Sequence, residues 1–230
     1  MKPRFPVFNE SVNFEKQCIF IAIPKTGTTS VRSQLRQEGD AFIPNPHLDI
    51  VQVRDALYVF FLANALGRNR TFPTASVPTD AELRGKAADV FQTFFKFSAV
   101  RNPWARAVSL YARREGVPVS DRLSFEAFCR QHFHASDTCR QPTLHRNQLD
   151  WLCDEDGRLA VDYVYRLEDF EEAIGEIERR TRGRVTLARR TENRNPASRS
   201  LSYRDVHTQE TREIIAKRFE KDIDYFRYAF

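Results

Sequence analysis

The stretch CIFIAIPKTGTTSVRSQL, residues 18–35, passes from an apolar run into a short hydroxyl-rich loop and then into a helical pattern. The apolar run, residues 18–23, predicts a buried strand that ends at Pro24. Gly27 allows a sharp turn, and the N–H groups at the start of the following helix would point into the loop. With the positive charge of Lys25, the stretch predicts a cradle for one phosphate or a similar tetrahedral anion.

The position of Lys25 distinguishes this loop from the phosphate-binding loop of nucleoside triphosphatases. That loop, GxxxxGK[ST], is longer, wraps two phosphates and ends in a hydroxyl that binds magnesium. Here Lys25 precedes Gly27, and the hydroxyls of Thr28, Thr29 and Ser30 follow it. The sequence therefore favours a single tetrahedral anion over a metal-bound triphosphate.

A second anion site is predicted in RNPWARAVSLY, residues 101–111. An apolar run over residues 94–100 is typical of a strand, and the Asn-Pro pair after Arg101 is a helix start. Arg101 would stand at the strand end with Ser109 about two turns into the helix, so both could contact one anion. Ligands of parallel α/β sheets bind beyond the carboxyl ends of the strands, where both motifs fall. Two such sites suit a nucleotide with phosphates on its 5′ and 3′ positions.

Strand-like and helix-like segments alternate along the rest of the chain. Further strands are expected at residues 41–43 and 161–165, and helices at residues 48–66, 125–133, 168–182 and 211–219. Gly67 is expected to end the first of these helices. The order predicts an α/β protein with a P-loop-like three-layer fold, in which helices flank a central parallel sheet.

The composition is that of a globular protein, with 41% hydrophobic residues and 19 phenylalanines among 230 residues. We expect one domain over residues 1–230, with a flexible segment at residues 1–16. The net charge of +5 and a pI of about 9.1 favour anionic ligands without choosing among them. The longest apolar runs fall short of the roughly 20 residues of a membrane span, so neither a span nor a signal peptide is expected.

The chain has four cysteines: Cys18, Cys129, Cys139 and Cys153. Cys18 lies in the predicted core strand, which argues against a full disulfide framework, although one bridge such as Cys129 to Cys139 stays open. His132 and His134 lie between these two cysteines in CRQHFHASDTC, but the spacing matches no standard zinc motif. We therefore expect no metal site.

Together, PKTGTTS and RNPWARAVSLY resemble the 5′ and 3′ phosphate-binding motifs of sulfotransferases that use 3′-phosphoadenosine 5′-phosphosulfate (PAPS). FFKFSAVRNPW, NQLDWLCDEDGRLAVDYVYRLEDFEEAI and KDIDYFRYAF extend the resemblance to the carbohydrate sulfotransferase group that contains the heparan 2-O and chondroitin enzymes. The resemblance covers about residues 18–230. It implies in-line transfer of a sulfuryl group from PAPS to an acceptor hydroxyl on a carbohydrate, with release of adenosine 3′,5′-bisphosphate (PAP) and no metal.

The resemblance also assigns roles to individual residues. It implies that the 5′ phosphosulfate is held by Lys25, Thr26, Gly27, Thr28, Thr29 and Ser30, and the 3′ phosphate by Arg101 and Ser109. Lys25 would also be catalytic, because it would neutralise the charge that grows on the bridging oxygen. The loop RTENRNPASRS would close over the nucleotide, with Ser198 and Arg199 as candidates. Leu167 stands in YRLED where many relatives carry an aromatic residue, so the contacts of that segment stay open.

We assign the general base for the acceptor hydroxyl to His47. An unperturbed imidazole pKa of about 6.5 suits this task, and five histidines compete for it. His47 follows the predicted second strand and opens a helix, which would place it at the same sheet edge as Lys25. Members of this group often carry their catalytic histidine in this interval. His145, in PTLHRNQLD, is the alternative base or an acceptor-binding residue, and His207 is interpreted as a surface residue.

Two other functions stay open from the sequence: a nucleotide kinase or hydrolase of the P-loop fold, and a non-catalytic module that binds glycans or nucleotides. An anionic acceptor could contact Arg54, Arg113 or Arg114, although a solvated surface is the simpler interpretation of each. No nucleic acid partner is expected. The chain is expected to be soluble; the lack of an anchor favours a cytoplasmic bacterial-type enzyme, whereas the resemblance favours a Golgi lumenal domain. The acceptor and the oligomeric state stay open.

Overall fold

The computed structural model describes residues 6–71, 77–112, 123–133, 146–188 and 202–230. A four-stranded sheet in the order β1-β2-β3-β4 forms its centre. Its strands are β1 (Val12–Asn13), β2 (Cys18–Ile21), β3 (Phe95–Val100) and β4 (Tyr163–Arg166). Strands β2, β3 and β4 are parallel, whereas β1 pairs antiparallel with β2 at the edge. The expected central parallel sheet is present in β2, β3 and β4, and the antiparallel β1, which was not expected, makes the whole sheet mixed.

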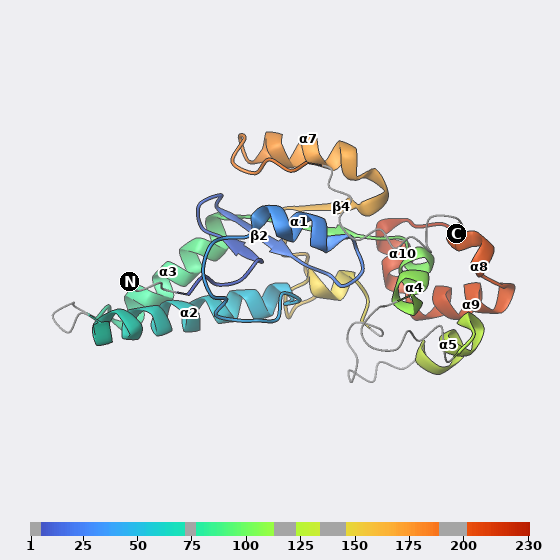
Figure 1. Cartoon of the computed structure of the whole chain (residues 1–230), viewed down its shortest axis with the longest axis horizontal. Coiled ribbons are helices and arrows are strands. Elements are labelled where there is room, and N and C mark those ends of the chain that lie inside the picture. The colour runs from blue at the N-terminus through green and yellow to red at the C-terminus, as the bar shows by residue number, and fades with distance from the viewer. Residues whose placement is uncertain (1–5, 72–76, 113–122, 134–145, 189–201) are drawn as a thin grey trace.

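The helices cover both faces and one end of this sheet (Figure 1). They are α1 (Thr28–Leu35), α2 (Ile50–Thr71), α3 (Asp80–Thr93), α4 (Pro103–Tyr111), α5 (Phe125–His132), α7 (Phe170–Arg180), α8 (Tyr203–Val206), α9 (Gln209–Arg218) and α10 (Glu220–Phe226), with 3-10 turns at Leu149–Trp151 and Leu167–Asp169. Helices α1 and α7 lie on one face of the sheet, and α2 and α3 lie on the other. Helices α4, α8, α9 and α10 gather beyond the end of β3.

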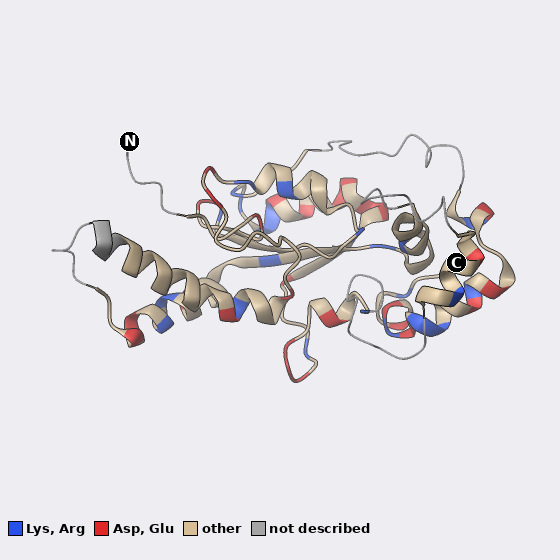
Figure 2. Cartoon of the chain, turned by 60° about the horizontal axis from the view of Figure 1, so that its bottom comes forward, with Lys and Arg blue, Asp and Glu red and all other residues tan. Residues whose placement is uncertain are grey.

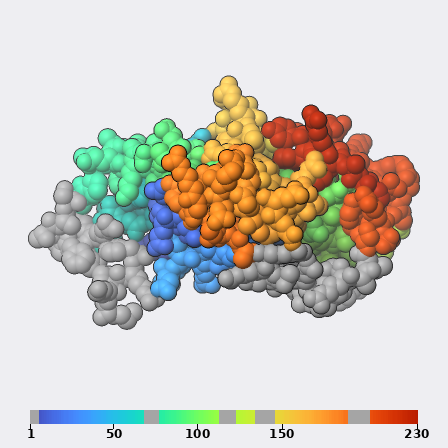
Figure 3. Space-filling view, turned by 90° about the horizontal axis from the view of Figure 1, so that it is seen from above, coloured from blue at the N-terminus to red at the C-terminus, as the bar shows by residue number. Residues whose placement is uncertain are grey.

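Two apolar layers hold the helices to the sheet. On one face, Phe20 and Phe97 pack with their ring centroids 5.0 Å apart, beneath residues of α1 and α7. Figure 3 shows α7 lying across this face with α1 beside it. On the other face, Ile19 and Ile21 join a core that includes Val53 of α2. This alternation within β2 buries both faces of the strand, and it confirms the predicted α/β class with helices on either side.

The N-terminal part of the chain differs from its prediction. Residues 6–16, expected to be flexible, pack against the sheet: Phe8 is fully buried and Val12–Asn13 forms β1. The strand expected at residues 41–43 is instead a single bridge between Val7 and Ala41. Phe42 and Ile43 still donate their N–H groups to the carbonyl oxygens of Val7 and Phe8, but Pro44 follows them and has no backbone N–H to continue the pairing.

Helix α2 is longer than its sequence pattern predicted. It continues past Gly67 to Thr71, since one glycine costs a helix only about 1 kcal/mol. Its window Ile50–Gly67, with a mean hydropathy of 1.3, is long and apolar enough by length and composition to cross a membrane. Core helices can meet the same criterion; 28% of this window is buried within the protein, including Val53 and Leu57. Figure 2 shows that basic and acidic residues are interspersed along the described helices.

Candidate functional site

The loop between β2 and α1 adopts a strained backbone. Lys25 has a φ of 70° and Gly27 a φ of 76°, so two residues in the left-handed region flank Thr26. Thr26 is fully buried, and its Oγ1 donates to the carbonyl oxygen of Ile23 at 3.0 Å. Gly27 is the N-cap of α1, and as a glycine it has no side chain that could accept a hydrogen bond from the helix. The first N–H groups of α1 therefore point into the loop with no hydrogen bond from a capping side chain.

The side chains of the loop divide between the core and the surface. Thr28 is buried with Thr26, whereas Gly27 and Thr29 are exposed. Lys25 and Ser30 are partly buried. The first turn of α1 contains no acidic residue. A backbone of outward N–H groups with a lysine and two accessible hydroxyls is the arrangement that binds a tetrahedral anion.

Arg101 connects the second motif to the first. It follows β3 directly, and its Nη1 donates to the carbonyl oxygen of Lys25 at 3.3 Å. Burial lowers the pKa of its guanidinium, while the nearby carboxylate of Glu168 favours the charged form. Ser109 is partly buried on α4, the helix that begins two residues after Arg101. The lysine loop and the start of the arginine motif therefore lie side by side at the carboxyl ends of neighbouring strands.

Arg106 is a site residue that the sequence reasoning missed. It is almost fully buried, and its Nε donates to the carbonyl oxygen of Pro24 at 3.1 Å. Burial lowers its pKa to about 10, against the opposing effect of Asp222. Arg101 and Arg106 therefore bind the carbonyls of two consecutive residues, Pro24 and Lys25. The only signal in the sequence was a second arginine in RNPWAR.

His47 lies beside the strand that leads into the lysine loop. Its Nδ1 is 2.6 Å from the carbonyl oxygen of Ala22, and its backbone N–H donates to Oδ1 of Asn45. A carbonyl oxygen only accepts, so Nδ1 carries a proton and Nε2 of the neutral ring has the lone pair. The contact with Ala22, three residues before Lys25, places His47 at the predicted edge of the sheet.

Compared with models of protein families, the sequence matches the one described as the sulfotransferase family over residues 12–229. The chain belongs to the sulfotransferase family. The match spans nearly the whole chain and confirms the predicted membership, together with a transferase activity that moves sulfuryl groups. No curated protein and no solved structure gave a match.

In this sulfotransferase the YRLED segment contacts both the lysine loop and the residues that follow β3. A Cβ atom built on Gly27 would lie 2.5 Å from Cδ1 of Leu167, so the leucine packs directly on the loop. Oε1 of Glu168 accepts the N–H of Asn102 at 2.9 Å. Asn102 in turn caps α4, because its Oδ1 accepts the N–H of Trp104 at 3.0 Å. Leu167 and Glu168 therefore join this segment to the lysine loop and to the start of α4.

Several predicted residues lie outside the described parts of the sulfotransferase: His134, Cys139, His145, Ser198, Arg199, Arg113 and Arg114. His207 is not the surface residue that was expected. It is partly buried, with its Nε2 3.1 Å from the carbonyl oxygen of Trp104 and its ring edge-on to Phe125. Arg54 pairs with Glu155 on the exposed face of α2.

Within the described ranges, Cys18, Cys129 and Cys153 are free thiols. The same ranges contain no group of three or more histidine, cysteine, aspartate or glutamate side chains that could hold a metal ion. Burial raises the pKa of Cys18 and of Cys129 to about 12, so neither thiol is activated as a nucleophile.

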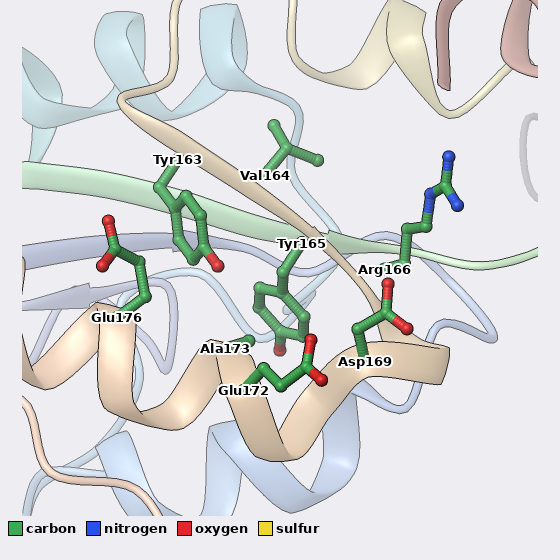
Figure 4. Close-up of a pocket in the computed structure, with 8 residues that line it drawn as sticks. All are labelled: Tyr163, Val164, Tyr165, Arg166, Asp169, Glu172, Ala173 and Glu176. Carbon is green, nitrogen blue, oxygen red and sulfur yellow. The ribbon is translucent and has the colours of Figure 1, made fainter. Parts of the chain in front are cut away.

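A cavity of about 330 Å³ lies between β4 and α7 of the sulfotransferase (Figure 4). It is lined by Tyr163, Val164, Tyr165, Arg166, Asp169, Glu172, Ala173 and Glu176. Three carboxylates against one guanidinium make this cavity a poor site for a nucleotide with two phosphates. Among the described residues, Lys25, Arg101 and Arg106 lie instead at the ends of β2 and β3.

Proposed function

We propose that this sulfotransferase uses PAPS as its donor and transfers the sulfuryl group to a hydroxyl of a carbohydrate. The observation that carries the proposal is the contact between the Arg101 guanidinium and the Lys25 carbonyl. It joins the lysine loop to the start of the arginine motif at one edge of the sheet. A donor with phosphates on both its 5′ and 3′ positions matches this pair of adjacent sites.

The lysine loop supplies the groups for the 5′ phosphosulfate. We assign this role to Lys25, Thr26, Gly27, Thr28, Thr29 and Ser30, through the backbone N–H groups of the α1 start, the hydroxyls and the ammonium group. Arg101 and Ser109 bind the 3′ phosphate. The buried hydroxyl of Thr26 already donates to Ile23, so this residue contributes its backbone and fixes the turn.

The transfer step divides between two side chains. His47 Nε2 accepts the proton of the acceptor hydroxyl as its oxygen attacks the sulfur. The bond between sulfur and the bridging oxygen of the 5′ phosphate breaks, and PAP leaves with the electron pair. Lys25 stabilises the negative charge that grows on that oxygen. The Ala22 carbonyl keeps the proton of His47 on Nδ1, which holds Nε2 as the acceptor.

A transfer assay with labelled sulfate tests the proposal. The protein is mixed with PAPS labelled on sulfur, a panel of glycans and a chelator, and label is counted on each glycan. We expect PAPS-dependent label on at least one glycan, lost in Lys25→Ala and kept in Lys86→Ala, which removes an exposed lysine of α3. Turnover of ATP with magnesium and no transfer from PAPS would contradict the proposal.

A further inference from the structure

Gln148 pairs with the backbone of Arg101 on both sides of the residue. Its Oε1 accepts the N–H of Arg101 at 2.9 Å, and its Nε2 donates to the Arg101 carbonyl oxygen at 2.9 Å. The pairing of β3 with β4 ends at Val100 and Arg166. The primary amide therefore replaces a neighbouring strand for one residue beyond the sheet, because it offers one acceptor and one donor at strand-like spacing.

This pairing fixes the direction of the Arg101 side chain. Side chains alternate along a strand, so Arg101 continues the row of Phe97 and Ala99. Phe97 and Ala99 pack with residues of α1 on one face of the sheet. A one-residue extension held in register therefore aims the guanidinium towards the loop that opens α1, where it meets the Lys25 carbonyl.

Gln148 is itself held by a buried carboxylate from the C-terminal helix. Asp222 of α10 is fully buried, as is Gln148. Oδ2 of Asp222 accepts from the backbone N–H of Gln148 at 2.8 Å and from its Nε2 at 3.2 Å, and Oδ1 accepts from the N–H of Leu149 at 2.9 Å. The second hydrogen of Nε2 is thus used by Asp222 while the first binds Arg101. A flipped amide would place its oxygen against both acceptors, so the network allows one orientation.

We propose that Gln148 is a positioning residue for the 3′ phosphate of the donor, acting through the backbone of Arg101 and held in place by Asp222. The inference rests on the proposed function, since it assigns Arg101 to that phosphate. Gln148 does not touch the donor; it sets where the guanidinium can reach. Loss of the network would weaken recognition of the 3′ phosphate, while Arg106 would still hold the Pro24 carbonyl and so keep the 5′ site in the lysine loop.

The test measures two dissociation constants, one for adenosine 5′-monophosphate (AMP) and one for PAP. The ratio compared is the AMP constant divided by the PAP constant. Only PAP carries the 3′ phosphate, so the ratio reports on that group alone. In Gln148→Leu we expect this ratio to fall about tenfold, as for one lost charge-assisted interaction, with the AMP constant unchanged within about threefold. A merely structural defect would weaken both ligands together and keep the ratio.

Thr181→Val is the matched control. Thr181 is fully buried, its Oγ1 donates to Ile177 and accepts from the N–H of Val185, and it lies at the end of α7. This variant should lower the melting temperature and leave the ratio at its wild-type value. If Gln148→Leu does not fold, Gln148→Glu keeps the size and the acceptor while it loses both N–H donors, and the same fall is expected.

Two results would overturn the inference in different ways. A folded Gln148→Leu or Gln148→Glu protein with the wild-type ratio would remove the positioning role and leave the proposed donor untouched. A wild-type ratio near one would instead remove the assignment of Arg101 to a 3′ phosphate, and with it both the proposed donor and this inference.

Discussion

The Nε of Arg106 donates to the carbonyl oxygen of Pro24 across 82 residues of sequence, at 3.1 Å. Arg101 does the same for the next carbonyl, that of Lys25. Arg106 of α4 and Arg101, two residues before the helix, therefore hold the backbone of the lysine loop at two consecutive points. The position of the lysine loop accordingly depends first on the almost fully buried Arg106, with Arg101 as a second contact.

Replacing Arg106 should therefore weaken donor binding as well as the fold. In Arg106→Met we expect an affinity for PAP at least about tenfold lower, because a buried charged hydrogen bond contributes about 1.5 to 3 kcal/mol. Calorimetry with PAP and a thermal melt measure the two effects. Arg130→Met is the control, since Arg130 pairs with Glu210 on the surface, and it should change neither by much. Unchanged PAP affinity in folded Arg106→Met would contradict the prediction.

Gly27→Ala should destabilise the protein through two separate causes. A φ of 76° costs a non-glycine residue about 1 to 2 kcal/mol, and the new Cβ would meet Leu167 Cδ1 at 2.5 Å. Gly157→Ala separates these causes, because Gly157 has a φ of 77° with no atom within 4 Å of a built Cβ. Urea unfolding should show a larger loss for Gly27→Ala.

The double variant Gly27→Ala with Leu167→Ala checks the steric part of that loss. Removing the leucine side chain should restore part of the stability that the new Cβ costs, beyond the effect of Leu167→Ala alone. Equal losses in Gly27→Ala and Gly157→Ala, with no coupling to Leu167, would show that the packing contact is unimportant.

Replacing His47 should slow the transfer step without weakening donor binding. In His47→Ala we expect the turnover number to fall by about 10² to 10⁴, the usual contribution of a general base, with the affinity for PAP unchanged. The wild-type turnover number should also fall as the pH is lowered, because a protonated imidazole cannot accept the hydroxyl proton. His207→Gln is the control for a lost imidazole. An equal fall in both variants would argue against His47 as the base.

His207 should make the protein less stable in mild acid. Burial lowers the pKa of His207 below 6.5 in the folded state, although the hydrogen bond to the Trp104 carbonyl acts in the opposite direction. Between the folded pKa and pH 6.5 the unfolded chain therefore binds more protons than the folded protein. The contribution of His207 to the free energy of unfolding is present above pH 6.5. It is lost as the pH falls through the folded pKa, by at most about 1.4 kcal/mol per pH unit. The free energy of unfolding, measured with urea at pH 7.5 and at pH 5.5, should differ less between the two pH values for His207→Gln than for wild type. Identical differences would contradict this.

The parts of the site that could be predicted from the sequence are those written in contiguous residues. The strand, turn and helix of the lysine loop form one local unit, and the Asn-Pro start of α4 is a cap that needs no distant partner. The rule that parallel strands end at one edge then brought Arg101 beside Lys25. Ser109 was assigned from its spacing to Arg101 and His47 from its place after the expected second strand, both with support from the resemblance, and their roles remain predictions.

The contacts that sequence patterns missed join residues far apart. Gln148 contacts Arg101 across 47 residues of sequence and Asp222 across 74. The spacing of apolar residues predicts helices and strands, but it gives no sign of a side chain that binds a distant backbone. The residues next to His207 predict an exposed position, but the rings of Phe125 and Phe230, which lie elsewhere in the sequence, pack against its imidazole. Strand β1, with two residues, is too short for an alternation pattern.

Calorimetry of the wild-type protein tests the central claim most directly. It compares PAP and AMP, each without metal, with ATP plus magnesium. If two adjacent anion sites grasp a doubly phosphorylated adenosine, PAP should bind at least about tenfold more tightly than either other nucleotide. Equal affinities for PAP and AMP, or tighter binding of ATP with magnesium, would contradict the account.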